Sequence, residues 1–330
     1  MNNQKKHLDI LAVLAKKENN LLLENNLKSK LFRKWLIFRE FLEGRAKLGD
    51  TFLTLLPGHL RDKKRRLGWD NDLSAQIISR YIFNIFGDYS RELVSLLGYQ
   101  VYYFRQGIDL NSQRLSFYVL TLLVETIIIA DQYCAKKFIK DDSVVIDAGA
   151  NIGIFSLYVS HLAPQGKIYS FEPTKDTFQV LNKNIISNNL ENRISVHNLA
   201  LGDKIGETEL IIAQSDFLNL GNAIINNNIE PKTTSNQKQP VKMITIDDFV
   251  KENKITKVDF VKIDTEGYEK QIIKGASETI KRFGPVIACS AYHLKDDKIK
   301  IPELIMAINP SYNFKLEKRG EEDLIFWIDQ

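Results

Sequence analysis

A strand–loop–helix pattern between residues 143 and 156 constrains the fold of this chain more than any other feature. It reads SVVIDAGANIGIFS, an apolar run that ends in Asp147, passes Gly149 and Gly153, and continues as an amphipathic helix. Glycine allows a tight turn and a close approach to a ligand, where a Cβ would collide. The helix that follows points its unpaired N–H groups toward whatever lies in the loop. The pattern predicts an α/β fold with a ligand at the end of a strand.

A second apolar run, Lys167 to Phe171, ends at Glu172. This residue lies about 20 positions beyond Gly149, where a carboxylate that accepts hydrogen bonds from two ribose hydroxyls is expected. The two elements together predict a crevice for a nucleoside. The dinucleotide pattern G-x-G-x-x-G would need glycine where the chain has Asn151 and Ile154. The loop D-x-G-x-N-x-G instead resembles motif I of the S-adenosylmethionine-dependent methyltransferases, which bind no pyrophosphate.

Composition restricts the remaining classes of protein. The 330 residues can form one large domain and a smaller one. A net charge of +4 is poor evidence for nucleic-acid binding, and the basic run 61–66 fits a solvated turn. The two cysteines, Cys134 and Cys289, lack metal-ligand spacing, which favours a reducing compartment and a cytoplasmic location. The longest charge-poor run, 115–130, is shorter than the roughly 20 residues that span a bilayer, so we expect a soluble protein.

The hydrophobic period changes along the chain. Up to about residue 100 apolar residues recur at helical steps, and short strands are predicted at 101–104 and 126–130. From about residue 140, strands alternate with helices, which predicts a mostly parallel sheet with helices on both faces. The predicted strands are 143–147, 167–172, 193–197, 207–213, 241–246, 258–264, 285–290 and a closing antiparallel pair at 313–318 and 323–328. The polar segment 214–240 is interpreted either as a lid over the acceptor or as a passive insertion.

Charged residues gather in the segment VDFVKIDTEGYE, which runs from Val258 to Glu269. Strand alternation places Lys262 and Asp264 on one side, with Glu266 two residues further on. In a parallel sheet these groups emerge at the edge where the glycine loop also lies. An acid in the first turn of a helix would explain Glu266 alone, but it would not explain all three residues together. We therefore expect this segment to belong to the ligand site.

A further apolar strand, Pro285 to Ser290, leads to Tyr292 and His293. The ordinary pKa of histidine is near 6.5, so an imidazole at a strand end could accept a proton at neutral pH. His293 is therefore a candidate general base.

Taken together these residues resemble the FkbM family of methyltransferases. The matching segments are VIDAGANIG, FEP, NLALGD at 198–203, ITIDDF at 244–249 and DFVKIDTEGYE, of which KID-x-EG is the most specific. The resemblance runs from about Val145 to His293. It implies a class I methyltransferase (Rossmann-like) fold, a doubly wound, mostly parallel sheet with an antiparallel C-terminal edge. We expect this domain over residues 111–330, preceded by a helical region of unknown role over 1–110.

The resemblance also implies a cofactor and a reaction. S-adenosylmethionine would bind the loop with its methionine end, Glu172 with its ribose, and the region of Asn198 and Ala200 with its adenine. The methyl group would pass to a hydroxyl of a small molecule, a sugar, or a glycan- or lipid-linked acceptor. The expected cofactor-binding residues are Asp147, Gly149, Ala150, Asn151, Gly153, Glu172, Asn198, Ala200 and Asp264.

The expected catalytic residues are His293, Asp264 and Glu266. Methyl transfer is an in-line displacement, and alignment of the reactants supplies much of its rate. His293 is the first candidate for the base and Asp264 the second, and Asp264 could also steady the cationic cofactor or orient the hydroxyl. Metal assistance by Asp264 and Glu266 lacks an evident third ligand, so no metal is expected.

Two other function classes stay open at this point. An NAD-dependent oxidoreductase would use the same kind of crevice, although the missing third glycine counts against it. A non-catalytic scaffold could retain the fold, although the intact loop and Glu172 argue against decay. No nucleic-acid partner is expected, and a homo-oligomer is possible.

Overall fold

The computed structural model describes residues 93–96, 99–102, 120, 123–211, 223–224, 238–319 and 321–329. All of them belong to the second of two compact units, residues 89–330. The helices predicted for the first 90 residues and most of the 214–240 segment lie outside the described residues, and the domain boundary near residue 110 stays a prediction. Strands β1 (Leu93–Leu96) and β2 (Tyr99–Tyr102) form an antiparallel pair, two residues ahead of the predicted strand at 101–104.

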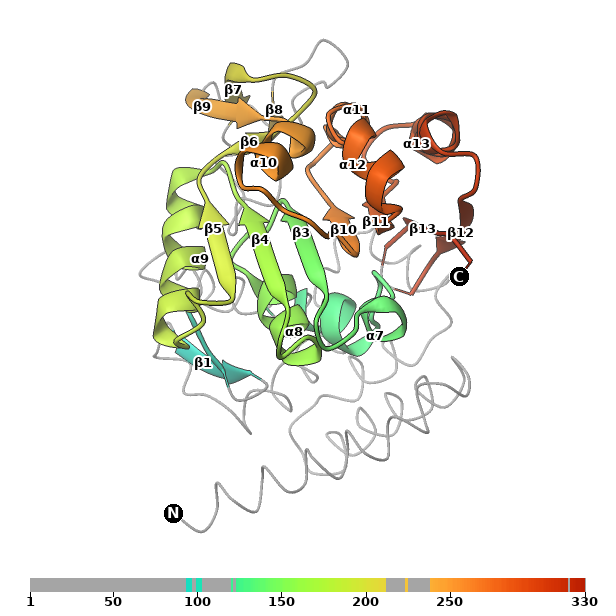
Figure 1. Ribbon diagram of the computed structural model, residues 1–330. Coiled ribbons are helices and arrows are strands. Elements are labelled where there is room, and N and C mark those ends of the chain that lie inside the picture. The colour runs from blue at the N-terminus through green and yellow to red at the C-terminus, as the bar shows by residue number, and fades with distance from the viewer. Residues whose placement is uncertain are drawn as a thin grey trace, which may run out of the picture. The chain divides into compact units, whose positions relative to one another are not determined.

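A seven-stranded sheet forms the centre of the second unit, in the order β12-β13-β11-β10-β3-β4-β5 (Figure 1). Its strands are β3 (Val144–Ala148), β4 (Lys167–Phe171), β5 (Ile194–His197), β10 (Phe260–Ile263), β11 (Val286–Ser290), β12 (Asn313–Glu317) and β13 (Asp323–Trp327). Neighbouring strands from β5 to β11 run parallel, whereas β13 is antiparallel to both β11 and β12. This confirms the class I methyltransferase architecture and the antiparallel pair at the C-terminal edge.

The strand order reverses beside β3. The chain passes from β3 outward to β4 and β5, then returns to place β10 on the other side of β3. Ligands of open α/β sheets bind in the crevice that such a reversal leaves beyond the carboxyl ends of the strands. The glycine loop and the KID-x-EG segment both begin at this point.

Helices cover both faces of the sheet. They are α7 (Ala135–Phe138), α8 (Ile154–Leu162), α9 (Lys175–Ser187), α10 (Ile246–Glu252), α11 (Glu269–Lys274), α12 (Ser277–Phe283) and α13 (Asp297–Ile308). Ile146, Val261 and Ile287 point to the face of α10–α13 and join one buried apolar cluster with residues of those helices. The alternate residues point the other way, where the ring of Phe260 packs 6.1 Å from that of Phe155 on α8.

Two predicted strands are not part of the parallel sheet. The segments expected at 207–213 and 241–246 are β7 (Gly206–Ile211) and β9 (Lys238–Ile244), which pair antiparallel. With β6 (Ala200–Leu201) and β8 (Ala223–Ile224) they form a separate sheet that lies beside α10 in Figure 1. Their single-face burial fits an antiparallel sheet with one side exposed to water.

The strand predicted at 126–130 is wrong. The segment is a π-helix, η1 (Val124–Ile129), which lies against α8 and buries Val124, Ile127 and Ile128. The β-branched isoleucines favour a strand by propensity, but the packing surface decides the conformation here.

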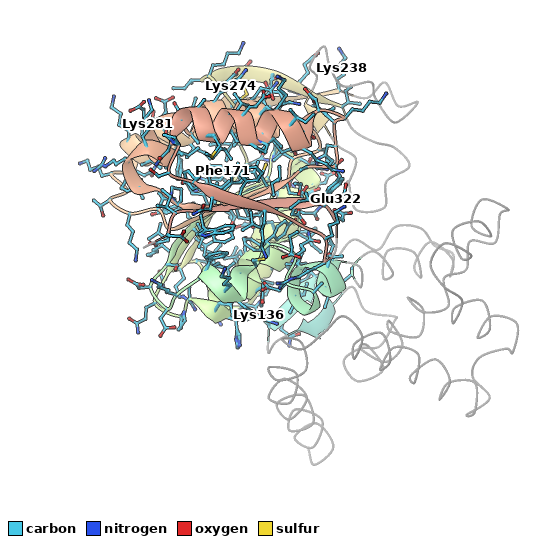
Figure 2. All side chains as sticks on the ribbon, turned by 90° about the vertical axis from the view of Figure 1, so that its right-hand side faces the viewer. Lys136, Phe171, Lys238, Lys274, Lys281 and Glu322 are labelled. Carbon is cyan, nitrogen blue, oxygen red and sulfur yellow. The ribbon has the colours of Figure 1, made fainter. Side chains whose placement is uncertain are left out.

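The outer surface carries the charges. In Figure 2 the labelled lysines point outward from the ribbon, whereas Phe171, at the end of β4, lies within. Among the described residues no helix is both long enough and apolar enough to cross a membrane.

Candidate active site

The glycine loop is shaped by contacts within the protein. Gly149 has φ +76, and a Cβ there would lie 1.9 Å from the backbone oxygen of Asp264. Gly153 has φ +94, and its Cβ would lie 2.7 Å from Leu181 on α9. Gly149 is therefore required by the packing of β3 on the KID-x-EG segment, and Gly153 by its left-handed backbone conformation, since the flexible side chain of Leu181 could move. From the sequence, both glycines were expected to serve a tight turn and the close approach of a ligand.

The N–H groups of this loop are already bonded. Those of Gly149 and Ala150 donate to the Phe171 carbonyl at 3.0 and 2.9 Å, and that of Gly153 donates to Ala150. The Asn151 N–H donates to Glu172 Oε2, and the Ile152 N–H to the side chain of Asn151. A pyrophosphate needs free N–H groups at this place. Because each N–H of residues 149–153 has an acceptor in the protein, the loop suits a cofactor without phosphates.

Glu172 joins the loop to the end of β4. Its Oε2 accepts from the Asn151 N–H at 3.0 Å and its Oε1 from the Thr174 N–H at 2.9 Å. Burial raises the pKa of this carboxyl group, and these hydrogen bonds oppose the shift. Each carboxylate oxygen can accept a second hydrogen bond. The Thr174 side chain also hydrogen-bonds to this carboxylate. Glu172 is therefore held in one orientation by three donors, with acceptor capacity left for a further hydroxyl.

Lys262 clamps the loop from the neighbouring strand. The register of β10 on β3 pairs Lys262 with Asp147, and Lys262 Nζ lies 3.3 Å from Asp147 Oδ1. The same ammonium donates to the Gly149 carbonyl at 2.7 Å. Asp147 is fully buried and accepts from Ser156 Oγ at 2.6 Å. Asp147 thus supports the loop from beneath.

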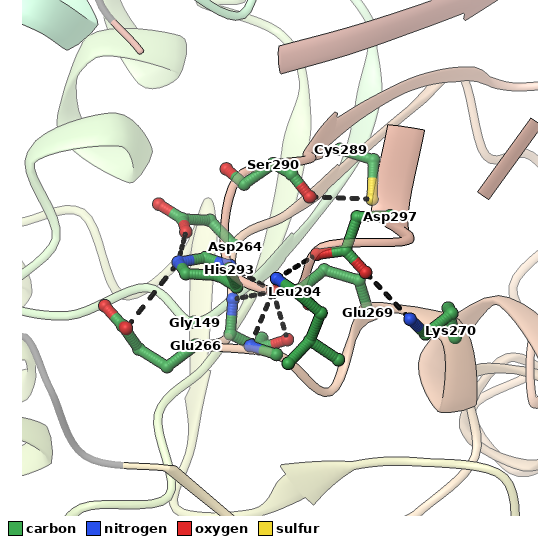
Figure 3. A network of polar contacts seen from close by, with 12 residues as sticks. Gly149, Asp264, Glu266, Glu269, Lys270, Cys289, Ser290, His293, Leu294 and Asp297 are labelled. Atoms are coloured by element: carbon green, nitrogen blue, oxygen red, sulfur yellow. Dashed lines mark hydrogen bonds and ion pairs between the residues drawn. The ribbon is translucent and has the colours of Figure 1, made fainter. Parts of the chain in front are cut away.

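His293 lies among three carboxylates from the KID-x-EG segment (Figure 3). Its Nδ1 is 3.0 Å from Glu269 Oε1, and its Nε2 is 3.7 Å from Asp264 Oδ1 and 3.6 Å from Glu266 Oε2. The structure therefore brings together the three residues expected to be catalytic. They do not reach this place by strand alternation, because β10 ends at Ile263 and Glu266 has φ +56.

The charged groups of this cluster shift one another's pKa values. Burial lowers the pKa of His293, but Glu269, Asp264 and Glu266 outweigh it and raise the pKa to about 9. Burial works against the charge of Asp264 as well, yet Lys262 and His293 lower the pKa of that carboxyl group. The pKa of Glu269 is lowered in the same way, because its hydrogen bond with His293 outweighs burial.

Two residues of the site were missed by the sequence analysis. Tyr133, which follows η1, donates its hydroxyl to Asp264 Oδ2 at 2.8 Å, and no sequence motif marks it. Burial, followed by the charge of Asp264, raises the pKa of this phenol well above its usual range. Glu269 stands in the KID-x-EG segment but had received no role. It begins α11, and its Oε1 accepts from the N–H groups of Thr265 and Gly267.

The residues expected near the adenine lie apart from this cluster. Asn198 donates to the carbonyls of Glu172 and Pro173 at 2.9 and 3.0 Å, and so holds the end of β4. Ala200 is buried in β6. These contacts place Asn198 beside Glu172, the residue predicted to bind the ribose. Contact of Asn198 or Ala200 with a cofactor stays a prediction.

A family model described as the methyltransferase FkbM domain matches residues 147–316, just over half of the chain. This chain belongs to the FkbM methyltransferase family. The match covers the glycine loop, Glu172, the KID-x-EG segment and His293. Because the chain belongs to a methyltransferase family, the alternative of an NAD-dependent oxidoreductase is set aside.

Curated relatives are similar over the same region. The methyltransferase sdnD of Sordaria araneosa is 26% identical over 199 residues, which cover 51% of this chain and 75% of that protein. The hexuronic acid methyltransferase AglP of Haloferax volcanii is 26% identical over 186 residues, 56% of this chain and 71% of that protein. Among solved structures, the methyltransferase FkbM of Methylobacillus flagellatus aligns with a TM-score of 0.45 at 21% identity, over 68% of this chain and 56% of that one.

Proposed function

We propose that this FkbM methyltransferase transfers the methyl group of S-adenosylmethionine to a hydroxyl oxygen of a sugar or a related small molecule. The observation that carries the proposal is the loop of residues 149–153, whose N–H groups are all bonded within the protein beside an oriented Glu172. This arrangement fits a nucleoside without phosphates. The sugar acceptor is favoured by the hexuronic acid methyltransferase among the relatives.

The roles of the residues follow from where they lie. Glu172 would hold the ribose hydroxyls, and the loop would border the methionine end of the cofactor. When bound, S-adenosylmethionine supplies a methyl group on a positively charged sulfur. The acceptor oxygen would take that methyl group and leave the sulfur with the electron pair of the broken bond, and the hydroxyl proton would pass to the carboxylate of Asp264.

Asp264 is the side chain best placed to meet the acceptor. Its side chain is 24% exposed, whereas that of His293 is 2% exposed and lies behind the carboxylates of Asp264 and Glu266. Tyr133 fixes one oxygen of Asp264. We therefore assign Asp264 to contact the acceptor hydroxyl and His293 to position Asp264, which reverses the order of candidates that the sequence suggested.

The experiment that tests the cofactor assignment is calorimetric titration with S-adenosylhomocysteine. Glu172→Gln should weaken binding about 10- to 100-fold, because hydrogen bonds to a charged group contribute about 1.5–3 kcal/mol. Glu191→Gln, at an exposed position before β5, is the matched control and should bind normally. A glycine variant would be a poor probe, because a Cβ at Gly149 collides with Asp264.

Absence of nucleoside binding by the wild-type chain would support a non-catalytic scaffold and overturn the proposal. With binding established, labelled S-adenosylmethionine should methylate uronic acids or neutral sugars, and Asp264→Asn should lose turnover while it keeps cofactor binding.

A further inference from the structure

The ring nitrogen Nε2 of His293 is a buried polar atom without a hydrogen-bond partner among the described residues. Its nearest neighbours are Asp264 Oδ1 at 3.7 Å and Glu266 Oε2 at 3.6 Å, on either side of the ring edge in Figure 3. Hydrogen bonds from nitrogen to oxygen fall at about 2.7–3.2 Å, so neither contact is one. The two carboxylates are in ion-pair contact with the ring, and neither forms a hydrogen bond with Nε2.

These separations suit an ion between the three side chains. Nitrogen and oxygen ligands lie about 2.0–2.2 Å from a small divalent cation, so neighbouring ligand atoms are about 3–3.5 Å apart. The two gaps to Nε2 need to close by only a few tenths of an ångström, and the Glu266 carboxylate would also have to turn toward Asp264. One ligand atom each from Asp264, Glu269 and His293 also lies within 4.8 Å of the others, so the cluster is compact.

Glu269 prepares the imidazole for this task. Its Oε1 faces His293 Nδ1 at 3.0 Å and is held by the N–H groups of Thr265 and Gly267. When a cation displaces the proton on Nε2, a carboxylate behind the ring keeps the other proton on Nδ1 and leaves the Nε2 lone pair pointing toward the ion, the arrangement typical of metal-binding histidines.

The charges also call for a cation. Asp264, Glu266 and Glu269 bring three negative charges around one imidazole, with Glu269 buried and the other two about a quarter exposed. A protonated imidazole compensates one of these charges, whereas a divalent cation compensates two. A divalent cation would balance the charges of Asp264 and Glu266.

We propose that Asp264, Glu266 and His293 Nε2 bind a divalent cation, with Glu269 as the carboxylate that orients the imidazole. The sequence offered two acidic ligands and no third, and the structure supplies His293. Two carboxylates and one imidazole suit Mn²⁺ and similar ions of the first transition row. On the proposed function, such a cation would lie beside Asp264, on the acceptor side, and would make a coordinated hydroxyl more acidic.

The test measures binding of Mn²⁺ to the full-length protein, after treatment with a chelator, by calorimetry and by loss of the free-ion signal in electron paramagnetic resonance. One site per chain is expected. Glu266→Gln and His293→Gln should each weaken Mn²⁺ binding at least tenfold. Glu303→Gln, at an exposed position on α13, is the matched control and should bind Mn²⁺ as the wild type does.

Titration with S-adenosylhomocysteine separates this proposal from the proposed function. The two variants should keep cofactor binding, because Glu172 is oriented by the backbone N–H groups of Asn151 and Thr174. Absence of a Mn²⁺ site in a wild-type protein that binds the cofactor would overturn the cation proposal alone. Unchanged Mn²⁺ binding in both variants would overturn it equally.

Discussion

Asp323 is a fully buried carboxyl group beside the site, supported by one hydroxyl. It lies on β13, where its Oδ1 accepts from Ser290 Oγ at 2.9 Å, and its Oδ2 has no hydrogen-bond partner among the described residues. Burial, followed by the negative charge of Asp264, raises the pKa of this group to about 8. The protonated form is therefore favoured in the folded chain at neutral pH.

This shift predicts a pH-dependent stability. A carboxyl group whose pKa is near 4 when unfolded and about 8 when folded binds more protons in the folded state between those values. The free energy of unfolding should therefore fall as pH rises through this window, by up to about 1.4 kcal/mol per pH unit. Asp323→Asn should remove that fall, because the amide keeps an acceptor for Ser290 without a charge.

Denaturant unfolding at pH 5, 7 and 8.5, with a chelator present, measures the effect. The variant should gain stability relative to the wild type as the pH rises. The exposed Asp141→Asn serves as the control and should follow the wild-type curve. Parallel curves for Asp323→Asn and the wild type would show that Asp323 is ionised in the folded chain.

At the scale of elements, two asparagines on α9 form the backbone hydrogen bonds with β2 that a neighbouring strand would otherwise form. Asn184 Oδ1 accepts from the Tyr102 N–H at 2.6 Å, and its Nδ2 donates to the carbonyls of Tyr102 and Ile152. One turn later, Asn188 bonds both backbone groups of Gln100. The side-chain amides thus tie β2 to the helix and, through Ile152, to the glycine loop.

The two positions should differ in their effect on stability. Asn184 is fully buried, so Asn184→Ala leaves the buried carbonyl of Ile152 and the partly buried backbone groups of Tyr102 without this partner and should destabilise the fold by about 2–3 kcal/mol. At Asn188 the bonds with Gln100 are exposed, so water replaces them and the loss should stay below about 1 kcal/mol. Thermal and urea unfolding of both variants check this, and equal losses would contradict it.

At the scale of the whole molecule, the site is assembled from segments far apart in the chain. Tyr133 follows η1, the loop follows β3, Glu172 follows β4 and His293 follows β11, and all belong to the unit 89–330. A ligand that bridges such segments binds the folded state only, so it should raise the melting temperature of that unit as a whole.

Scanning calorimetry tests this linkage. S-adenosylhomocysteine at a hundred times its Kd should add about 2.7 kcal/mol of stability and raise Tm by roughly 5–10 °C. In Glu172→Gln the same concentration should give a clearly smaller rise. An unchanged Tm in the wild type at that concentration would contradict a site built from these segments.

Local patterns predicted much of the fold and part of the site. The ends of β3 and β4, and with them Gly149 and Glu172, could be predicted because period and turn residues are local properties of the sequence. The π-helix η1 could not be predicted, because its isoleucines favour a strand by propensity and adopt a helix only through their packing on α8. The strands β7 and β9 were predicted, but they were assigned to the parallel sheet, because the pattern of a strand does not show which strand it pairs with.

The sequence by itself determined most of the order of strands and helices and the family to which the chain belongs, and it predicted a nucleoside crevice. Only the tertiary structure decided how the polar groups meet. Tyr133 and Asp264 are 131 positions apart, and His293 and Glu269 are 24 apart, yet each pair is in hydrogen-bond contact. Such contacts depend on strand register and on the loops between elements, where packing of the whole core sets the geometry. The buried Nε2 of His293 between two carboxylates exists only in the folded chain.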